Sequence, residues 1–232
     1  MWGWMVAVSA VLVLGSALGL AAWWLATSER QIATYSVRGS LRSISLDLGR
    51  ADAVIMGGGS RQAVEVRRTD SFAFGRHALA QRQVSAGVLR LRSRCADMVL
   101  GACSATYQVT VPDNIPVNVR TSSGDVRFNA YRGSARIDTG TGNIDVTAYC
   151  GFALQARAET GNVRANASCA PERMELRSRT GDIQAIVPPG RYRLDADSDG
   201  GSRNVRGVTP ADDAPFQIQA LSSAGDVDVE TR

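Results

Sequence analysis

The sequence predicts an all-β protein, a parallel β-solenoid with coils of about 19 residues, preceded by an irregular β cap and by one transmembrane helix. Three observations predict this architecture. The chain opens on an apolar segment, its middle contains short runs of alternating apolar and polar residues, and its second half repeats a Gly-Asp or Gly-Asn turn at nearly constant spacing.

The first 26 residues carry no charged side chain. As a helix rising about 1.5 Å per residue they would span a hydrocarbon core of about 30 Å, and aromatic residues at both ends suit the two membrane interfaces. These residues are Trp2, Trp4, Trp23 and Trp24. A small-x-small cleavage site is missing, because Trp23, Trp24 and Leu25 occupy its place. This favours an uncleaved anchor over 1–26, with a cleaved signal peptide as the alternative.

Residues 27–36, "TSERQIATYS", are polar and predict a short linker. Residues 37–116 contain alternating runs such as "LRSISLDL", "AVEVRR", "VLRLRS" and "TYQVTV". These runs predict less regular coils or an antiparallel cap. A cap is expected because the open edge strand at the end of a solenoid invites pairing with another chain.

Residues 117–232 contain the repeat. The turn glycines are Gly124, Gly142, Gly161, Gly181, Gly201 and Gly225, with spacings of 18, 19, 20, 20 and 24. The second position after each glycine holds Val126, Ile144, Val163, Ile183, Arg203 and Val227. Further apolar columns alternate with polar ones on both sides of the turn, which is the period-2 pattern of strands that face a core. Each coil therefore reads as strand, tight corner, strand and looser corner.

The four cysteines predict two disulfides. A zinc site is the rival interpretation, but there is no CxxC pair and the single histidine, His77, is remote in sequence. Cys150 and Cys169 each follow a turn glycine by eight residues, so they fall at the same point of successive coils. Stacked strands lie about 4.8 Å apart, inside the Cα window of about 4.4–6.8 Å for a disulfide. We predict Cys150–Cys169, which leaves Cys95 for Cys103.

The predicted disulfides place the domain outside the cytoplasmic membrane, because disulfides persist in oxidising compartments. Arg30 and Arg38 follow the apolar segment and, by the positive-inside rule, predict the opposite orientation. We give the cysteines more weight. The net charge is only +4, with 26 basic and 22 acidic residues, so a nucleic-acid partner is not expected.

The words "SSGDVRF", "GTGNIDV", "ETGNVRA", "RTGDIQA" and "SAGDVDV" resemble the bacterial putative-adhesin family of β-strand-repeat proteins. The similarity covers roughly residues 35–232. It implies a β-solenoid domain of the cell envelope or surface, behind a signal peptide or membrane anchor, and it supplies no catalytic residues. The word "DGGSRNV" departs from the pattern at Ser202 and Arg203, which predicts a bulge or a locally irregular coil.

Catalysis is not expected. A glycan-cleaving β-helix would need paired carboxylates or a positioned base, whereas Asp125, Asp182 and Asp226 are explained by the chemistry of corners. A Ser-His-Asp triad would rest on His77 alone. One carboxylate or amide per coil supplies too few oxygens for calcium. We therefore predict no catalytic, cofactor or metal residues.

Charged side chains alternate in sign along the outward columns, except at Arg157, Arg177 and Arg179. These three are our candidate patch for an anionic ligand, such as an envelope polymer or a lipid headgroup. The predicted function is a membrane-tethered, extracytoplasmic, adhesin-like binding or scaffold module, with a surface protein as another partner. The alternatives are an accessory protein of envelope-stress signalling and a glycan-cleaving enzyme.

Overall fold

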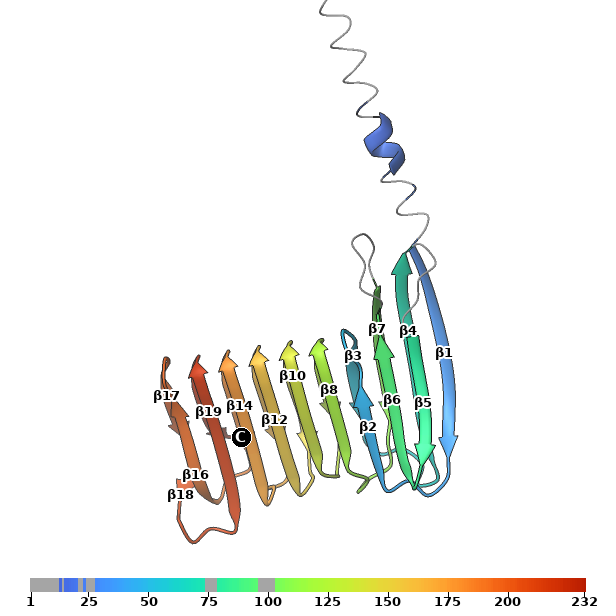
Figure 1. Ribbon diagram of the computed structural model, residues 1–232. Coiled ribbons are helices and arrows are strands. Elements are labelled where there is room, and N and C mark those ends of the chain that lie inside the picture. The colour runs from blue at the N-terminus through green and yellow to red at the C-terminus, as the bar shows by residue number, and fades with distance from the viewer. Residues whose placement is uncertain (1–12, 14, 21–22, 24–27, 74–78, 96–102) are drawn as a thin grey trace, which may run out of the picture.

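The computed structural model describes residues 13, 15–20, 23, 28–73, 79–95 and 103–232. The described residues up to 23 are helical, and those from 28 onward contain two ten-stranded sheets (Figure 1). The all-β prediction is confirmed. The strands are β1 (Ser28–Arg38), β2 (Ser43–Asp47), β3 (Asp52–Met56), β4 (Ala63–Ala73), β5 (Leu79–Ser85), β6 (Val88–Arg94), β7 (Cys103–Thr110), β8 (Val117–Ser123), β9 (Val126–Asn129), β10 (Ala135–Thr141), β11 (Ile144–Tyr149), β12 (Ala153–Thr160), β13 (Val163–Ala167), β14 (Arg173–Thr180), β15 (Ile183–Val187), β16 (Arg191–Ser198), β17 (Arg203–Arg206), β18 (Thr209–Pro210), β19 (Phe216–Ala224) and β20 (Val227–Thr231).

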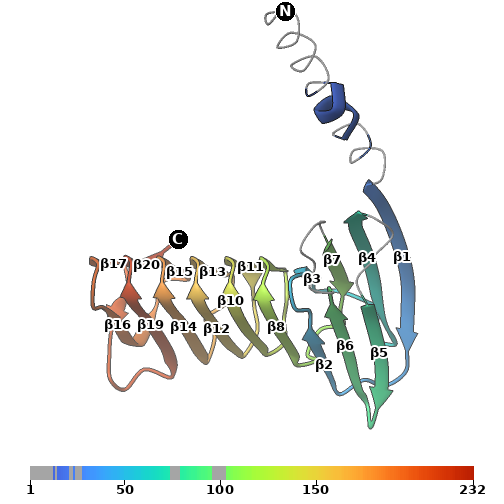
Figure 2. The ribbon, with the colours of Figure 1, turned by 45° about the horizontal axis from the view of Figure 1, so that its top comes forward.

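The two sheets face each other, and from β8 to β17 the chain alternates between them. The first sheet has the order β1-β4-β7-β3-β9-β11-β13-β15-β20-β17, and the second has the order β18-β16-β19-β14-β12-β10-β8-β2-β6-β5. Equivalent residues of successive coils pair in parallel register, as Ile137 does with Val119 and Ala156. The parallel solenoid is thus confirmed, with one strand of each coil in each sheet (Figure 2).

The core lies between the sheets and consists of the predicted inward columns. Val119, Ile137, Val146 and Leu176 are completely buried, as are the other aliphatic residues at alternate positions of the same strands. A short apolar side chain at each of these positions fills the narrow space between two sheets. The outward positions between them hold the polar and charged residues. Apolar and polar residues therefore alternate in the sequence because successive side chains point to opposite faces of each strand.

The tight corners bring the backbones of successive coils into close contact. Gly142, Gly161, Gly181 and Gly225 have φ angles between 141° and 147°, and a Cβ at any of them would collide with the carbonyl oxygen of the glycine in the coil below. Only glycine meets both demands, because it lacks a Cβ and tolerates positive φ. The repeated glycine is therefore a consequence of stacking the corners on one another.

The residue after each corner glycine forms a ladder of hydrogen bonds along the stack. In every step a side-chain oxygen accepts the backbone N–H of the equivalent residue in the next coil, at 2.8–3.0 Å. From acceptor to donor, the steps run Asp52 to Asp125, Asp125 to Asn143, Asn143 to Asn162, Asn162 to Asp182, Asp182 to Asp226 and Asp226 to Ser202. Asp and Asn recur here because their short side chains carry an oxygen that reaches a neighbouring N–H.

The coils do not stack in the order of the sequence at the C-terminal end. The last coil, β19 and β20, lies between the coil of β14 and β15 and the coil of β16 and β17. This corrects the sequential order assumed from the repeat, in which Ser202 separated Asp182 from Asp226. The reason is physical: an interior coil must bury its inward side chains completely, and Val227 and Val229 do so, whereas Arg203 at the corresponding position stays exposed.

At the other end, the stack begins before residue 117. Strands β2 and β3 form a regular coil, since β2 pairs in parallel with β8 and β3 pairs in parallel with β9. Strands β6 and β7 continue the two sheets in parallel, and β1, β4 and β5 add antiparallel pairs at the outer end. The cap is therefore partly solenoid and partly antiparallel.

The predicted linker over 27–36 is corrected, because β1 begins at Ser28 and pairs with β4 along its whole length. Its alternate residues Tyr35 and Val37 turn toward the interior, and Val37 is buried. Polar side chains at the other positions made this segment look like a linker. They lie at the outer edge of a sheet, where water solvates them.

The predicted membrane helix over 1–26 lies largely outside the described residues. Within the ranges given above, no helix is both long and apolar enough to cross a membrane.

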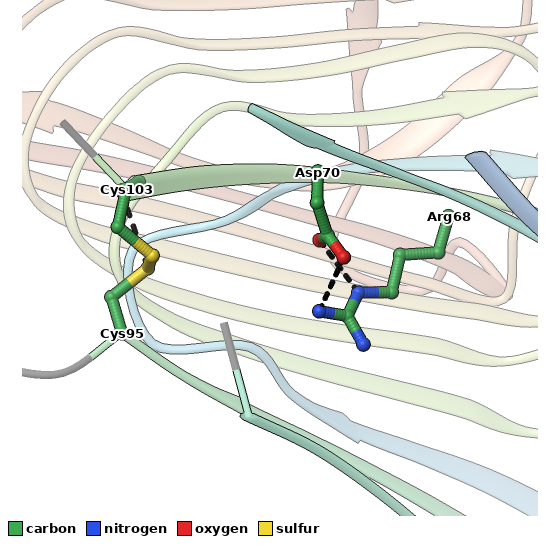
Figure 3. Close-up of a disulfide and its surroundings, with 4 residues drawn as sticks. All are labelled: Arg68, Asp70, Cys95 and Cys103. Atoms are coloured by element: carbon green, nitrogen blue, oxygen red, sulfur yellow. Dashed lines mark hydrogen bonds and ion pairs between the residues drawn. A yellow bond between two sulfur atoms is a disulfide. The ribbon is translucent and has the colours of Figure 1, made fainter. Parts of the chain in front are cut away.

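Both predicted disulfides are confirmed. Cys150 and Cys169 join two successive coils with their Cα atoms 4.8 Å apart, and Cys95 and Cys103 join β6 to β7 with a Cα separation of 5.9 Å (Figure 3). The described residues contain no free cysteine. The Cys150–Cys169 bond closes a loop of 19 residues, and such a loop stabilises a fold by about 3 kcal/mol on the chain-entropy model.

Candidate functional site

The three predicted arginines lie together on the outer face of the second sheet. Arg157 on β12 pairs in register with Arg177 on β14, and Arg179 follows on the same face of β14. They line an open hollow of about 500 Å³ together with Asp197 and Asp199 from β16 and the loop after it. The structure therefore brings the candidate residues together, as the sequence predicts.

Each of these arginines has a carboxylate partner. Arg157 Nη2 lies 2.7 Å and Arg177 Nε lies 2.9 Å from the same oxygen, Oε1 of Glu175. Arg179 Nε lies 2.9 Å from Oε2 of Glu159. Since Asp197 and Asp199 also line the hollow, carboxylates offset the positive charge of the guanidinium groups there. An anionic ligand would have to compete with these partners.

The pKa of Glu175 reports on this arrangement. Partial burial alone would raise the pKa of its carboxyl group, but hydrogen bonds from Arg157 and Gln155, together with the positive charge of Arg177, outweigh burial and lower the pKa below its usual value. Glu175 is thus charged at neutral pH and holds two arginines in fixed positions. The patch is a preorganised ion-pair network on a solvated face.

The corner carboxylates Asp125, Asp182 and Asp226 have a structural role. Each lies in the ladder described above and accepts a backbone N–H from the next coil. The pKa of Asp226 is lowered because it accepts hydrogen bonds from both the backbone N–H and the hydroxyl of Ser202. Their positions at successive corners of the stack follow from the repeat.

His77 lies outside the described residues, so the structure places neither it nor a triad built on it. Within the described part of the chain, no three His, Cys, Asp or Glu side chains are grouped so that they could hold a metal ion.

The interior of the cap contains a buried ion pair close to the Cys95–Cys103 disulfide (Figure 3). Arg68 and Asp70 on β4 are joined by two contacts of 2.6 and 2.7 Å, and their side chains are only 11% and 8% exposed. The guanidinium group of Arg68 also lies 5.7 Å from the centre of the Tyr107 ring, and burial raises the pKa of Tyr107. Arg68 and Asp70 compensate each other's charge, which is how a charged pair is accommodated between two sheets.

A second, smaller hollow lies on the same outer face, over β2, β6 and β8. It has a volume of about 140 Å³, and its lining includes Arg90, Arg92, Arg120, Asp47 and Asn118. Sequence reasoning missed this group. The signal was present in "VLRLRS", where arginines at alternate positions must share one face of a strand.

Between the two hollows, a groove crosses the second sheet, and both apolar and polar side chains line it. Its volume is about 500 Å³, and outward side chains from five neighbouring strands line it. The polar members come from equivalent positions of successive coils: Ser45, Asn118, Arg136, Gln155 and Glu175. Hydroxyl, amide and charged groups thus run in a row along the stack.

These features define a class of protein: a two-sheet parallel β-solenoid whose corners are stacked glycines and whose outer faces carry polar and charged side chains. Within this class, the chain belongs to the Toastrack DUF4097 family, whose model matches residues 108–231. The matched region begins near the end of β7 and includes every later strand.

Solved structures resemble this chain to different degrees. One, described as a putative cell adhesion protein from Clostridium sporogenes, has a TM-score of 0.51 and 8% sequence identity, covering 88% of this chain and 100% of its own. Another, described as a putative adhesin from Bacteroides fragilis, has a TM-score of 0.46 and 14% identity, covering 87% and 97%. A third, described as a putative lipid binding protein from Parabacteroides distasonis, has a TM-score of 0.30 and 12% identity, covering 87% and 97%. No curated protein matches the sequence.

Proposed function

We propose that the protein is a non-catalytic, adhesin-like binding or scaffold module of the bacterial cell envelope. The observation that carries this proposal is the outer face of the second sheet, where polar and charged side chains from neighbouring strands line two hollows and the groove between them. A rigid stack holds these groups at fixed spacing, which suits recognition of an extended polar partner. The name of the Clostridium sporogenes protein, which shares the fold, agrees with such a role.

We further propose that residues 1–26 tether this domain to the cytoplasmic membrane from outside. The segment has no charged side chain and the length of a membrane span, and β1 begins only two residues after it. Two disulfides in the following domain support an oxidising compartment. The anionic partner is then an envelope polymer or a surface protein within reach of a membrane-bound solenoid.

Two measurements test the location. Protease added to intact spheroplasts should digest the domain, and sequencing of the mature N-terminus should find it at Met1 or close to it. Protection of the domain in sealed cells would refute the extracytoplasmic orientation. A mature N-terminus near Thr27 would refute the retained anchor and would leave the domain exported.

Binding and turnover are tested together on the purified full-length chain. We expect retention on an immobilised acidic envelope polysaccharide that weakens as salt rises, because exposed charges are screened beyond about 10 Å in 0.1 M salt. We expect no change in the chain length or reducing ends of the polysaccharide. Release of shorter fragments would contradict the non-catalytic assignment, and absence of retention on acidic and neutral polymers alike would contradict the binding role.

A further inference from the structure

We propose that the hollow over β2, β6 and β8 binds a phosphate group. The proposal deepens the function given above, on which it rests, by assigning the chemical class of the ligand and the residues that take it. Arg90 and Arg92 project from β6, and Arg120 projects from β8, on the same outer face as the groove. Strands β6, β2 and β8 are direct neighbours in the sheet (Figure 1).

The register of the strands explains why these side chains converge. Arg92 on β6 and Arg120 on β8 both pair with Asp47, which lies between them on β2, and Arg90 pairs with Ser45. Neighbouring strands lie about 4.8 Å apart, and outward residues on one strand recur about every 6.6 Å. Three guanidinium groups therefore surround one small hollow whose other polar lining comes from Ser45, Asn118 and Asp47.

The charge balance of this hollow differs from that of the Arg157 patch. Three positive side chains against the single carboxylate of Asp47 leave a net charge of +2. Arg120 pairs with Asp138 outside the hollow at a long distance, 3.6 Å, and within the described chain neither Arg90 nor Arg92 makes an ion pair. Their guanidinium donors are therefore available, whereas those of Arg157, Arg177 and Arg179 are engaged by glutamates.

The dimensions and donors of the hollow select the ligand class. A volume of about 140 Å³ accommodates one oxyanion. Arginine presents planar pairs of N–H donors that match phosphate oxygens, and a phosphomonoester carries a charge of about −1.5 to −2 at pH 7, close to the excess positive charge here. Phosphate fits both conditions, and the remainder of a polymer or lipid would lie along the groove.

The test compares two pairs of substitutions on one face of the full-length protein. In R90S/R92S the proposed site loses two donors, and R157S/R177S removes the same number and kind of residue from the ion-paired patch. Binding of inorganic phosphate is measured by calorimetry at constant ionic strength. We expect R90S/R92S to weaken phosphate binding by about tenfold or more and R157S/R177S to change it by less than about twofold.

A third variant, D47N, separates a loss of binding from a loss of folding, because it is expected to bind phosphate more tightly and an unfolded protein could not do so. Removing the only carboxylate in the hollow raises its net charge, so phosphate should bind more tightly than to the unmodified protein. Unchanged or weaker binding in D47N, equal losses in the two arginine pairs, or full binding in R90S/R92S would each overturn the proposal. Retention on acidic polysaccharide without phosphate binding would overturn this inference and leave the proposed binding function standing.

Two further probes identify the source of the phosphate. Competition by soluble polyphosphate and binding to vesicles that contain phosphatidic acid, whose headgroup is a phosphomonoester, are measured with the same three variants. Dependence of polyphosphate competition on Arg90 and Arg92 assigns the site to a soluble polymer, and the same dependence of vesicle binding assigns it to a lipid headgroup. Independence of both from these arginines counts against the site.

Discussion

A side-chain oxygen of Asp182 accepts the backbone N–H of Asp226 at 2.9 Å, although 44 residues separate the two in the sequence. The three steps of the ladder between Asp125 and Asp182 join residues 18 to 20 apart. The longer separation arises because the chain passes through the coil of Ser202, forms the end of the stack, and then returns to fill the position beside Asp182.

Cross-linking can check this order. Arg177 lies beside Leu221 in the register of β14 and β19, and Leu221 lies beside Asp197 of β16. We expect the double variant R177C/L221C to form a disulfide on oxidation, because adjacent strands lie about 4.8 Å apart, and R177C/D197C to form none, because a strand intervenes. Peptide mapping under non-reducing conditions reads the result. A bond in R177C/D197C would restore the sequential order.

The ladder should contribute measurably to stability. Asn162 both donates its N–H to Asn143 and accepts the N–H of Asp182, so Asn162→Ala leaves one N–H of the stack without its side-chain acceptor. We expect a loss of about 1 kcal/mol in the free energy of unfolding, measured by urea denaturation. Asn129→Ala is the control, since this exposed residue lies outside the ladder and should cost less than about 0.5 kcal/mol. Equal effects would mean that the ladder adds nothing.

Close approach at the corners, rather than positive φ alone, should make glycine necessary. Gly161 and Gly39 have similar φ angles of 141° and 130°, but a Cβ at Gly161 would collide with the Gly142 carbonyl oxygen and one at Gly39 would meet open space. We expect Gly161→Ala to destabilise by more than about 3 kcal/mol and Gly39→Ala by about 1–2 kcal/mol. Thermal unfolding of the two variants compares them directly, and similar losses would assign the whole cost to φ.

The coil of β16 and β17, which ends the stack, should resist pairing with the strands of another chain. At this end Ser202 occupies the ladder position, and its side chain has no carbonyl oxygen that could accept the N–H of a further coil. Arg203 occupies the position where other coils have an aliphatic residue. We expect Ser202→Asp combined with Arg203→Val to promote end-to-end association, because an apolar edge with free acceptors invites strand pairing. Sedimentation velocity at increasing concentration detects it. A variant that stays as dispersed as the original chain would show that other features protect this end.

Acid should weaken the network around Glu175. Its pKa in the folded protein lies below the ordinary value of 4.5, so the folded state binds this proton less readily than the unfolded state. The stability that Glu175 contributes is therefore present above pH 4.5 and is lost as pH falls through the lower, folded-state pKa. We expect Glu175→Gln to flatten the dependence of unfolding free energy on pH below 4.5. An unchanged acid slope would refute this role.

Most of the fold could be predicted because the repeat exposes it. The columns of Val and Ile, the corner glycines and the two cysteines at equal positions all follow from stacking identical coils, and each appears in the sequence at a fixed offset. The linker over 27–36 was mistaken for a separate element because an edge strand that faces water has no apolar face to reveal it.

The stack order and the charge balance could not be predicted, for a common reason. Both depend on which residues become neighbours across strands. The exchange of the last two coils brings Asp182 next to Asp226, and the pairing of Arg157 and Arg177 with one glutamate depends on side-chain reach. A row of arginines in the sequence gives no measure of how many carboxylates face it, so Arg157 and Arg177 stood out and Arg90 and Arg92 did not.

Insertion of the C-terminal coil also has a consequence for biosynthesis. Residues 216–231 are synthesised after the coil of β16 and β17, yet they fill an interior position between two coils made earlier. The coil of β16 and β17 pairs with β19 and β20 and not with β14 and β15. Until β19 and β20 are made, it therefore lacks its neighbouring strands. The stack therefore cannot form by adding coils in the order of their synthesis, and β19 and β20 must be made before the coil of β16 and β17 takes its place.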